Sequence, residues 1–111
     1  MEIKAKDIVL KFLNALNAEN FEAARGTLDD NMQFNGVMGS REGADSYIND
    51  MSKMRFKYYV LKVFENENDV CVFYDIDMNG KRIFTCGWYV LQDEKIKSLR
   101  VIFDPRPILE K

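Results

Sequence analysis

The chain has 111 residues, of which 47% are hydrophobic and 31% are charged. Its 16 basic and 18 acidic residues give a net charge of −2, and the two signs alternate without forming a basic stripe, which argues against a nucleic-acid partner. The sequence contains no histidine, which excludes Ser-His and Cys-His nucleophilic sites and the common zinc sites.

The length of the chain predicts a single domain spanning residues 1–111. Residues 1–12 mix charged with apolar side chains, and no later segment reaches the ~18 consecutive apolar residues of a membrane span. We therefore expect a soluble cytoplasmic protein with no membrane partner. The two cysteines, Cys71 and Cys86, are expected to be reduced, buried thiols. No cofactor is predicted.

The first half of the chain is mainly helical in pattern. Apolar residues recur at helical spacing over residues 5–16 and again over 44–54. Between these helices, Asn20 is the predicted N-cap of a short second helix with apolar residues at positions 21, 24 and 28. A short strand is expected over 31–37, followed by a loop with the sequence GSREG.

After Met54 the hydrophobic period changes from helical to two, which predicts strands. Four strands are expected, over 56–64, 70–78, 81–91 and 96–103, and they form an antiparallel meander. The Asn79-Gly80 pair is a strong signal for a two-residue hairpin turn, and the prolines at 105 and 107 are expected to end regular structure. Three helices followed by these strands predict an α+β fold with helices on one face of a curved sheet.

A two-residue turn at Asn79 and Gly80 fixes the register of the hairpin and divides its side chains between two faces. One face carries Val70, Val72, Tyr74, Ile76, Ile83, Thr85, Gly87 and Tyr89. The other carries Cys71, Phe73, Asp75, Asp77, Arg82, Phe84, Cys86 and Trp88. Both faces are substantially apolar, and the helices can cover only one of them. The second face is therefore a candidate subunit interface.

The order of elements resembles the SnoaL-like branch of the nuclear transport factor 2-like superfamily. The resemblance is carried by the segments FLNALNAENFEAARGTLDDNMQFNGVMGSREGADSYI and WYVLQDEKIKSLRVIFDP and covers nearly the whole chain. It implies a cone-shaped fold in which three N-terminal helices and a curved, mainly antiparallel sheet enclose a deep pocket. It also implies a homodimer through the outer face of the sheet, around Phe73, Phe84, Trp88 and Ile102.

The superfamily contains ketosteroid isomerase, and the resemblance places the catalytic positions of that enzyme on this sequence. The general base falls on Asn35, the oxyanion-binding tyrosine on Phe12, and the late aspartate near Gly87. Steroid isomerisation by that mechanism is excluded, because none of the three chemical groups is present. The same alignment puts Asp75 and Asp77 on the outer face, where ion pairs are favoured over catalytic acids.

The implied pocket has a predicted set of ligand-binding residues, which are Phe12, Asn35, Tyr47, Tyr58, Val72, Tyr74, Thr85, Gly87, Tyr89, Val101 and Phe103, joined by Leu99. A tyrosine hydroxyl can donate to a ligand carbonyl, or it can belong to a core residue whose hydroxyl is satisfied within the protein. Gly87, which has no side chain, is expected to leave space for the cavity.

Some further residues have two interpretations. Arg41 could bind an anionic ligand at the mouth of the pocket or be a solvated loop residue. Asp104 could approach the rim or simply terminate the last strand. The same ambiguity between pocket lining and core packing applies to the four methionines Met32, Met38, Met51 and Met54.

Three functions stay open at this level. We favour a non-catalytic protein that binds a small, largely apolar molecule. The alternative is an isomerase- or cyclase-type enzyme that transfers a proton in the same pocket, although the sequence supplies no clear pocket acid or base. The third interpretation is a dimeric assembly module whose pocket is filled by its own side chains.

Overall fold

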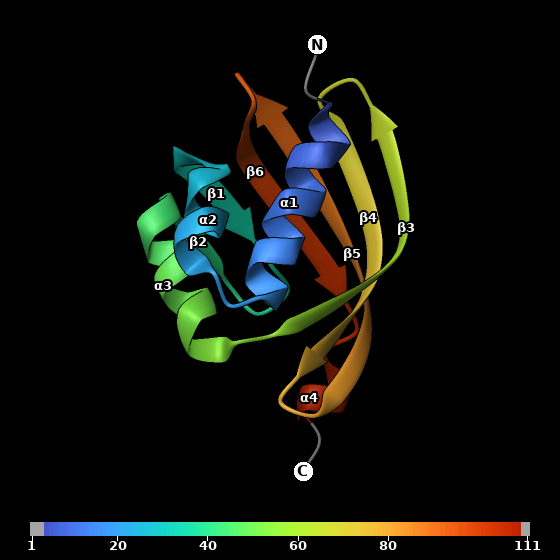
Figure 1. Ribbon diagram of the computed structural model, residues 1–111. Helices are drawn as coiled ribbons and strands as arrows, with labels where there is room; N and C mark the ends of the chain where they lie inside the picture. The colour runs from blue at the N-terminus through green and yellow to red at the C-terminus, as the bar shows by residue number, and fades with distance from the viewer. Residues whose placement is uncertain (1–3, 110–111) are drawn as a thin grey trace.

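The computed structural model describes residues 4–109, in which helices pack against the concave face of a curved six-stranded sheet (Figure 1). The elements in chain order are α1 (Ala5–Asn17), α2 (Phe21–Gly26), β1 (Leu28–Asn35), β2 (Ser40–Glu42), α3 (Ala44–Met54), β3 (Lys57–Asn66), β4 (Asp69–Met78), β5 (Lys81–Gln92), β6 (Lys95–Phe103) and α4 (Arg106–Leu109). The α+β cone predicted from the sequence is confirmed. None of the helices described is long and apolar enough to cross a membrane.

The helices follow the apolar patterns of the sequence closely. α1 buries one face, made of Ala5, Val9, Phe12, Leu13, Ala15 and Leu16. Asn20 caps α2 as predicted, because its side-chain oxygen accepts a hydrogen bond from the Ala23 N–H at 3.1 Å. α3 has the predicted bounds and ends at Arg55, whose φ of 54° is left-handed and stops the helix.

The sheet has the strand order β2-β1-β6-β5-β4-β3, which includes two strands outside the predicted meander. β1 pairs in parallel with β6, and every other neighbouring pair is antiparallel. Part of the expected GSREG loop is the short strand β2, and β1 begins at Leu28 instead of residue 31. β2 gave no sequence signal because all three of its residues are exposed, so it shows no alternating burial.

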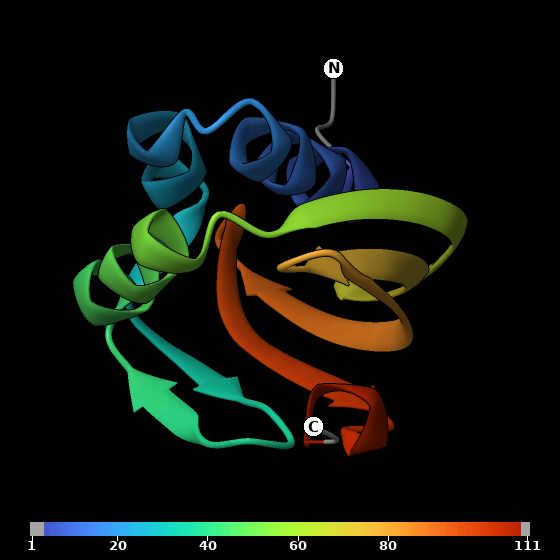
Figure 2. The same ribbon diagram turned by 90° about the horizontal axis from the view of Figure 1, so that it is seen from below.

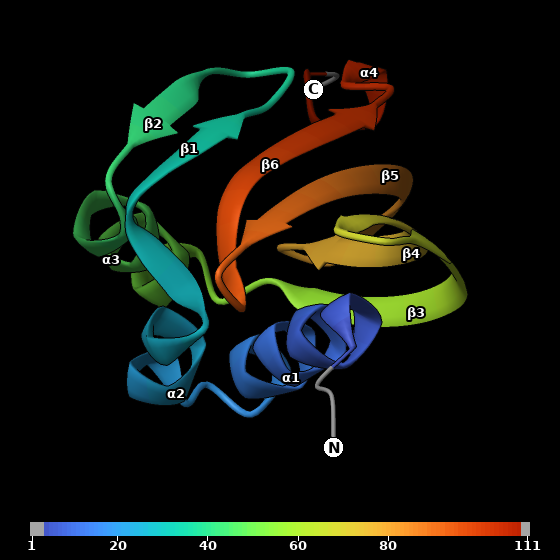
Figure 3. The same ribbon diagram turned by 90° about the horizontal axis from the view of Figure 1, so that it is seen from above.

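The chain also forms a helical turn after β6 where only irregular structure was expected. This turn is α4. Pro107 stands in its first turn, where a missing backbone N–H costs no helical hydrogen bond. The end-on views show the sheet curling from β3 to β1 around the helices, with α4 close to the β1–β2 loop (Figures 2 and 3). Register shifts in the β1–β6, β3–β4 and β5–β6 pairs accompany this curvature.

The β4–β5 hairpin has the predicted register, with Asp77 opposite Arg82 and Gly87 opposite Val72. Asn79 and Gly80 both have positive φ, at 56° and 92°, as a type I′ turn requires. We call the side of the sheet that faces the helices the inner face. Its hairpin residues are all buried, namely Val70, Val72, Tyr74, Ile76, Ile83, Thr85, Gly87 and Tyr89.

The opposite side, the outer face, has no helix over it among the described residues and is partly or fully exposed. Phe84 and Ile102 are 62% and 68% exposed there. Cys71 and Cys86 are both free, as expected, but they lie on this face and are only partly buried. The expectation of fully buried thiols was therefore wrong, because strand alternation directs both side chains away from the helices.

Candidate functional site

A cavity of about 400 Å³ lies between the inner face, α3 and the β1–β2 loop at residues 36–39. Its walls are mainly aromatic, aliphatic and methionine side chains. The residues that line it are Phe34, Gly36, Val37, Met38, Gly39, Ser40, Arg41, Tyr47, Asp50, Met51, Met54, Phe56, Tyr58, Tyr74, Ile76, Met78, Tyr89, Leu99, Val101, Phe103 and Ile108. A concave apolar cavity with a few polar groups is typical of small-molecule sites.

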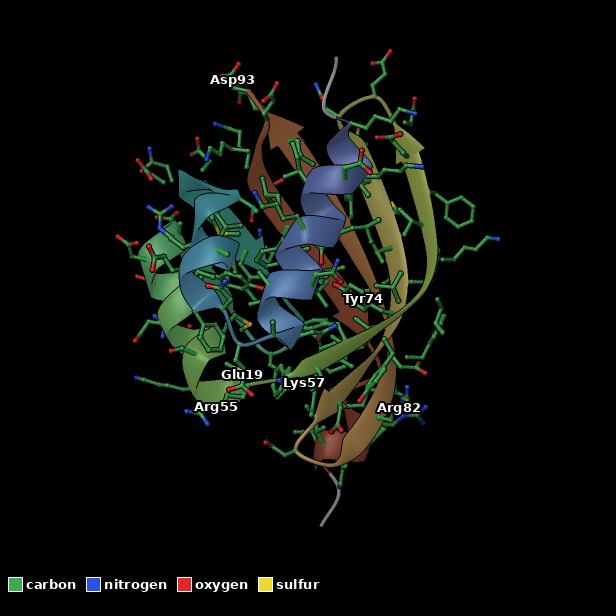
Figure 4. All side chains as sticks on the ribbon, viewed as in Figure 1. Glu19, Arg55, Lys57, Tyr74, Arg82 and Asp93 are labelled. Carbon is green, nitrogen blue, oxygen red and sulfur yellow. The ribbon has the colours of Figure 1, made fainter. Side chains whose placement is uncertain are left out.

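Four tyrosines line this cavity, and we call them the inner tyrosines: Tyr47 from α3, Tyr58 from β3, Tyr74 from β4 and Tyr89 from β5. All four are buried. Figure 4 shows Tyr74 in the interior, between α1 and the strands. Burial raises the pKa of each hydroxyl above its ordinary value. Nearby tyrosines raise the pKa of Tyr47, Tyr58 and Tyr89 further, whereas the hydrogen bond with Tyr89 offsets part of the rise at Tyr74. At neutral pH the inner tyrosines are therefore uncharged hydrogen-bond donors.

The hydroxyl protons outnumber the acceptors that the described protein provides. The Tyr74 and Tyr89 oxygens are 2.9 Å apart, so one hydroxyl donates and the other keeps a free proton. Tyr58 donates only to the weak acceptor Met51 Sδ, at 3.7 Å. Within residues 4–109 the Tyr47 hydroxyl has no hydrogen bond, although this residue is only 2% exposed.

The Tyr47 oxygen has contact with the cavity, because every fully enclosed side-chain oxygen and nitrogen of residues 4–109 has a hydrogen-bond partner. Without a partner among these residues, this hydroxyl can donate to water in the cavity or to the acceptor oxygen of a ligand. The cavity lining thus keeps two donor protons without an acceptor in the described protein, one on Tyr47 and one in the Tyr74–Tyr89 pair.

Gly87 has a different role from the one expected. The space above it is not part of the cavity, because the Tyr74 hydroxyl occupies it. A Cβ atom at position 87 would collide with that hydroxyl and lie 3.0 Å from the Tyr89 ring. The missing side chain therefore lets the Tyr74–Tyr89 hydrogen bond form.

Tyr58 is positioned by the end of α1. The Asn17 side-chain amide donates to the Tyr58 carbonyl at 2.8 Å, and its oxygen accepts from the Tyr58 N–H at 2.7 Å. Lys57 adds hydrogen bonds of 2.9 Å to the Asn17 carbonyl and to Glu19. Figure 4 shows Glu19, Arg55 and Lys57 together at this end of α1. These contacts hold the start of β3 against α1 and aim Tyr58 into the cavity.

Two charged residues, Arg41 and Asp50, belong to the cavity lining that the structure describes, and they pair with each other. Arg41 Nε donates to Asp50 Oδ2 at 2.6 Å, and Arg41 Nη2 donates to Oδ1 at 3.3 Å. Asp50 was not anticipated, although its position one helical turn after Tyr47 could have placed it on the same face of α3. Among residues 4–109, no three acidic or cysteine side chains gather as a potential metal site.

The structure brings together only part of the predicted residue set. Tyr47, Tyr58, Tyr74, Tyr89, Leu99, Val101 and Phe103 line the cavity, as does Arg41. Phe12, Val72, Thr85 and Gly87 are buried but lie outside the lining. Phe12 supports the site from behind, with its ring centroid 6.4 Å from that of Tyr47 and 6.2 Å from that of Tyr89. Met38, Met51 and Met54 line the cavity, whereas Met32 belongs to the core.

Asn35 and Asp104 lie away from the cavity. Strand alternation in β1 turns Phe34 toward α3, so its neighbour Asn35 is exposed and borders a shallow cleft on the outer face. The expected pocket position of Asn35 was therefore wrong. Asp104 is exposed and holds the turn before α4 by accepting hydrogen bonds from Arg106, whose side chain also lowers the pKa of that carboxyl.

Asp75 and Asp77 lie on the outer face, as the family resemblance implied, and neither lines the cavity. Arg82 forms an ion pair with Asp75 at 3.7 Å, while the Asp77 carboxylate accepts a hydrogen bond from the Gly80 N–H at 2.8 Å. The guanidinium of Arg82 also lies over the Tyr59 ring, 3.8 Å from its centroid. Figure 4 shows Arg82 pointing away from the helices.

No protein-family model matches the sequence, and no curated protein matches it. The structure is similar to that of an NTF2-like protein of unknown function from Cytophaga hutchinsonii, with 55% sequence identity and a TM-score of 0.96 over 99% of this chain and 98% of that chain. Two further solved structures share the fold.

An LEH-like epoxide hydrolase from M. tuberculosis has 21% identity and a TM-score of 0.82, with 96% of this chain and 86% of that chain covered. An uncharacterized cystatin fold protein from Novosphingobium aromaticivorans has 10% identity and the same TM-score, with 91% and 99% covered. At these identities the two likenesses describe the architecture alone.

Proposed function

The chain belongs to the nuclear transport factor 2-like (NTF2-like) family, and on this premise we propose that its cavity binds a small, largely apolar molecule carrying a hydrogen-bond acceptor. The observation that carries the proposal is an apolar cavity of about 400 Å³ lined by Tyr47 and the Tyr74–Tyr89 pair, whose hydroxyls keep two protons without an acceptor in the described part of the chain. Apolar burial would supply affinity, and the hydroxyl groups would orient the ligand.

The charged and titratable groups favour binding over catalysis. Asp50 is the one carboxylate of the described lining, and both of its oxygens accept hydrogen bonds from Arg41. The inner tyrosines have raised pKa values and are poor proton acceptors at neutral pH. Asp50 is the single feature that supports the alternative, an isomerase- or cyclase-type enzyme. The cavity itself argues against a module filled by its own side chains.

The first experiment blocks the cavity. We expect N-phenyl-1-naphthylamine, an apolar dye that fluoresces when buried, to bind the parent protein. Val101→Trp should weaken this binding about tenfold or more, because the indole would occupy cavity space. The matched control is Ile102→Trp, since the neighbouring side chain points to the outer face. Absence of dye binding to the parent, or equal binding by the Val101 variant, would overturn the proposal.

Met54→Trp provides a second blocking variant if Val101→Trp does not fold, because Met54 lines the cavity from the exposed end of α3. The acceptor requirement is tested by displacing the dye with octan-2-one or octane. Tyr47→Phe should weaken octan-2-one about fivefold, as expected for one lost hydrogen bond, and leave octane unchanged. Equal losses for both probes would contradict a donor role for this hydroxyl.

The outer face supports a proposal about assembly, namely that the protein forms a homodimer there. Phe84, Trp88 and Ile102 are exposed on it, and Phe73 stacks on Phe84 with ring centroids 6.0 Å apart. Ile102 forms a ridge between two shallow clefts. A ridge flanked by grooves can pack against a second copy of itself, and a contiguous apolar patch of this kind is unusual on a monomer.

A further inference from the structure

We infer that the bound molecule is an amphipathic carboxylate whose charged group lies at the cavity mouth against Arg41. This inference rests on the proposed function and adds the chemical class of the ligand. The cavity interior and its mouth differ in the groups that they offer, and the difference sets the orientation of such a ligand. Its apolar body would lie inside, and its anionic end would stay near solvent.

Arg41 is directed to the cavity by its place in the sheet. It lies opposite Phe34 in the β1–β2 pair, and cross-strand neighbours project to the same face. Phe34 packs on Tyr47 with ring centroids 5.0 Å apart, and both line the cavity. Arg41 is the one basic side chain in the lining of the region described.

The guanidinium of Arg41 has N–H donors that Asp50 does not engage. Asp50 engages Nε and Nη2, so the two protons on Nη1 have no partner among residues 4–109. Asp50 therefore acts as a positioning residue: its side chain is only 19% exposed, and its two hydrogen bonds fix the plane of the guanidinium. A planar group held in this way can present its remaining edge to a carboxylate.

The cavity interior, unlike its mouth, offers no positive charge to a carboxylate from the residues described. Its polar groups are neutral hydroxyls, and a carboxylate buried without a counter-charge pays a large desolvation cost. Arg41 has a side chain that is 54% exposed, so an anion beside it would keep part of its hydration. A carboxylate with an inner carbonyl or hydroxyl oxygen would satisfy both Arg41 and the inner tyrosines.

The test compares decanoate with decanamide, a neutral molecule of nearly the same shape, as competitors of N-phenyl-1-naphthylamine at neutral pH. The parent should prefer decanoate about fivefold, as expected for a partly exposed charge pair. Arg41→Gln should abolish this preference. Arg82→Gln is the matched control, because Arg82 is similarly exposed and also pairs with an aspartate, but on the outer face. It should retain the preference.

Asp50→Asn provides a second test, because it should change the preference for decanoate in the direction opposite to Arg41→Gln. Its amide oxygen can still accept from Arg41, but the repulsion between two carboxylates disappears, so the preference for decanoate should increase. Raising the salt from about 50 mM to about 500 mM should reduce the preference in the parent, through screening.

The two proposals fail in different ways. If the dye does not bind the parent at all, the proposed function is wrong. If the dye binds but decanoate shows no preference over decanamide, only the carboxylate inference is overturned. The same holds if Arg82→Gln reduces the preference as much as Arg41→Gln, because the effect would then be one of net charge.

Discussion

The two faces of the sheet are built from the same strands and are both rich in apolar residues, yet they differ in their polar groups. On the inner face these are the neutral hydroxyls of buried residues such as Tyr74 and Tyr89, except for Arg41 at the cavity mouth, which pairs with Asp50. On the outer face they are charged, as in the Arg82–Asp75 pair and the Arg100 guanidinium, 5.9 Å from the Trp88 ring centroid. Apolar content alone therefore does not identify the face that encloses a site, whereas the kind of polar group does.

High pH should cause the largest loss of unfolding free energy, and this loss should come from the inner face. The inner tyrosines have pKa values raised by burial, so they stay protonated in the folded chain, while in the unfolded chain they ionise above about pH 10. Their contribution to stability is complete below pH 10 and is lost as the pH rises. We expect about 1 kcal/mol of lost unfolding free energy per inner tyrosine at about pH 11.

Urea unfolding across this pH range measures the loss, and phenolate absorbance reports how many tyrosines ionise. The fifth tyrosine, Tyr59, lies on the outer-face side of β3 under Arg82. Ionisation of any inner tyrosine in chains that are still folded, seen as phenolate absorbance that is lost in the matching Tyr→Phe variant, would contradict their burial.

Gly87→Ala should be the most damaging small substitution on the inner face. The added methyl group would displace the Tyr74 hydroxyl, and we expect a loss of about 1–3 kcal/mol of unfolding free energy. Tyr74→Phe in the same chain should restore part of this loss, because it removes the colliding oxygen. Gly26→Ala is the control, since a methyl group added there would meet no atom within 4 Å. Losses that simply add in the double variant would rule out the collision.

Ile102→Glu tests the outer face. A charge on the exposed ridge should weaken the proposed homodimer about tenfold or more, measured by sedimentation at micromolar concentration, and should leave dye binding intact. Leu61→Glu is the control, because Leu61 is also exposed and apolar but lies on the edge strand β3. A parent protein that sediments as a monomer would show the dimer proposal to be wrong.

Asp75→Asn and Asp77→Asn should have the smallest effects. Asp75 has a long ion pair with a partly exposed arginine, and Asp77 supports a surface turn. We expect each variant to change the unfolding free energy by about 1 kcal/mol or less and to bind the dye as the parent does. Loss of dye binding in either variant would mean that these carboxylates affect binding in the cavity.

The parts of this structure that the sequence predicts are those governed by local rules. The Asn79-Gly80 turn alone determined the hairpin register, and with it the residues that share a face with Tyr74 and Tyr89. The inward direction of that face came from the family resemblance. The pairing of β1 with β6 could not be predicted in this way, because it joins segments far apart in the chain. Asn35 was misplaced for a related reason: its face depends on a strand whose start and partner were not recognised.

The site shows the same limit. Gly87 was correctly placed on the inner face, but its purpose depends on a hydroxyl from the neighbouring strand. Asp50 carries no motif; helical spacing places it on the same face of α3 as Tyr47, but its pairing with Arg41 follows from the contact between α3 and β2. Contacts between secondary-structure elements determine both the role of Gly87 and the pairing of Asp50. Such contacts cannot be read directly from a single sequence.

The parallel pairing of β1 with β6 also has a consequence for the order in which the protein folds. Leu28 pairs with Ile96, so β1 lacks its main neighbour until the residues of β6 have left the ribosome. β6 lies between β1 and β5 in the sheet, and its docking joins the N-terminal helices to the hairpin. Contacts between such distant segments slow folding. We therefore expect the insertion of β6 to limit the folding rate, and the partly built cone to expose its apolar interior to chaperones until that step is complete.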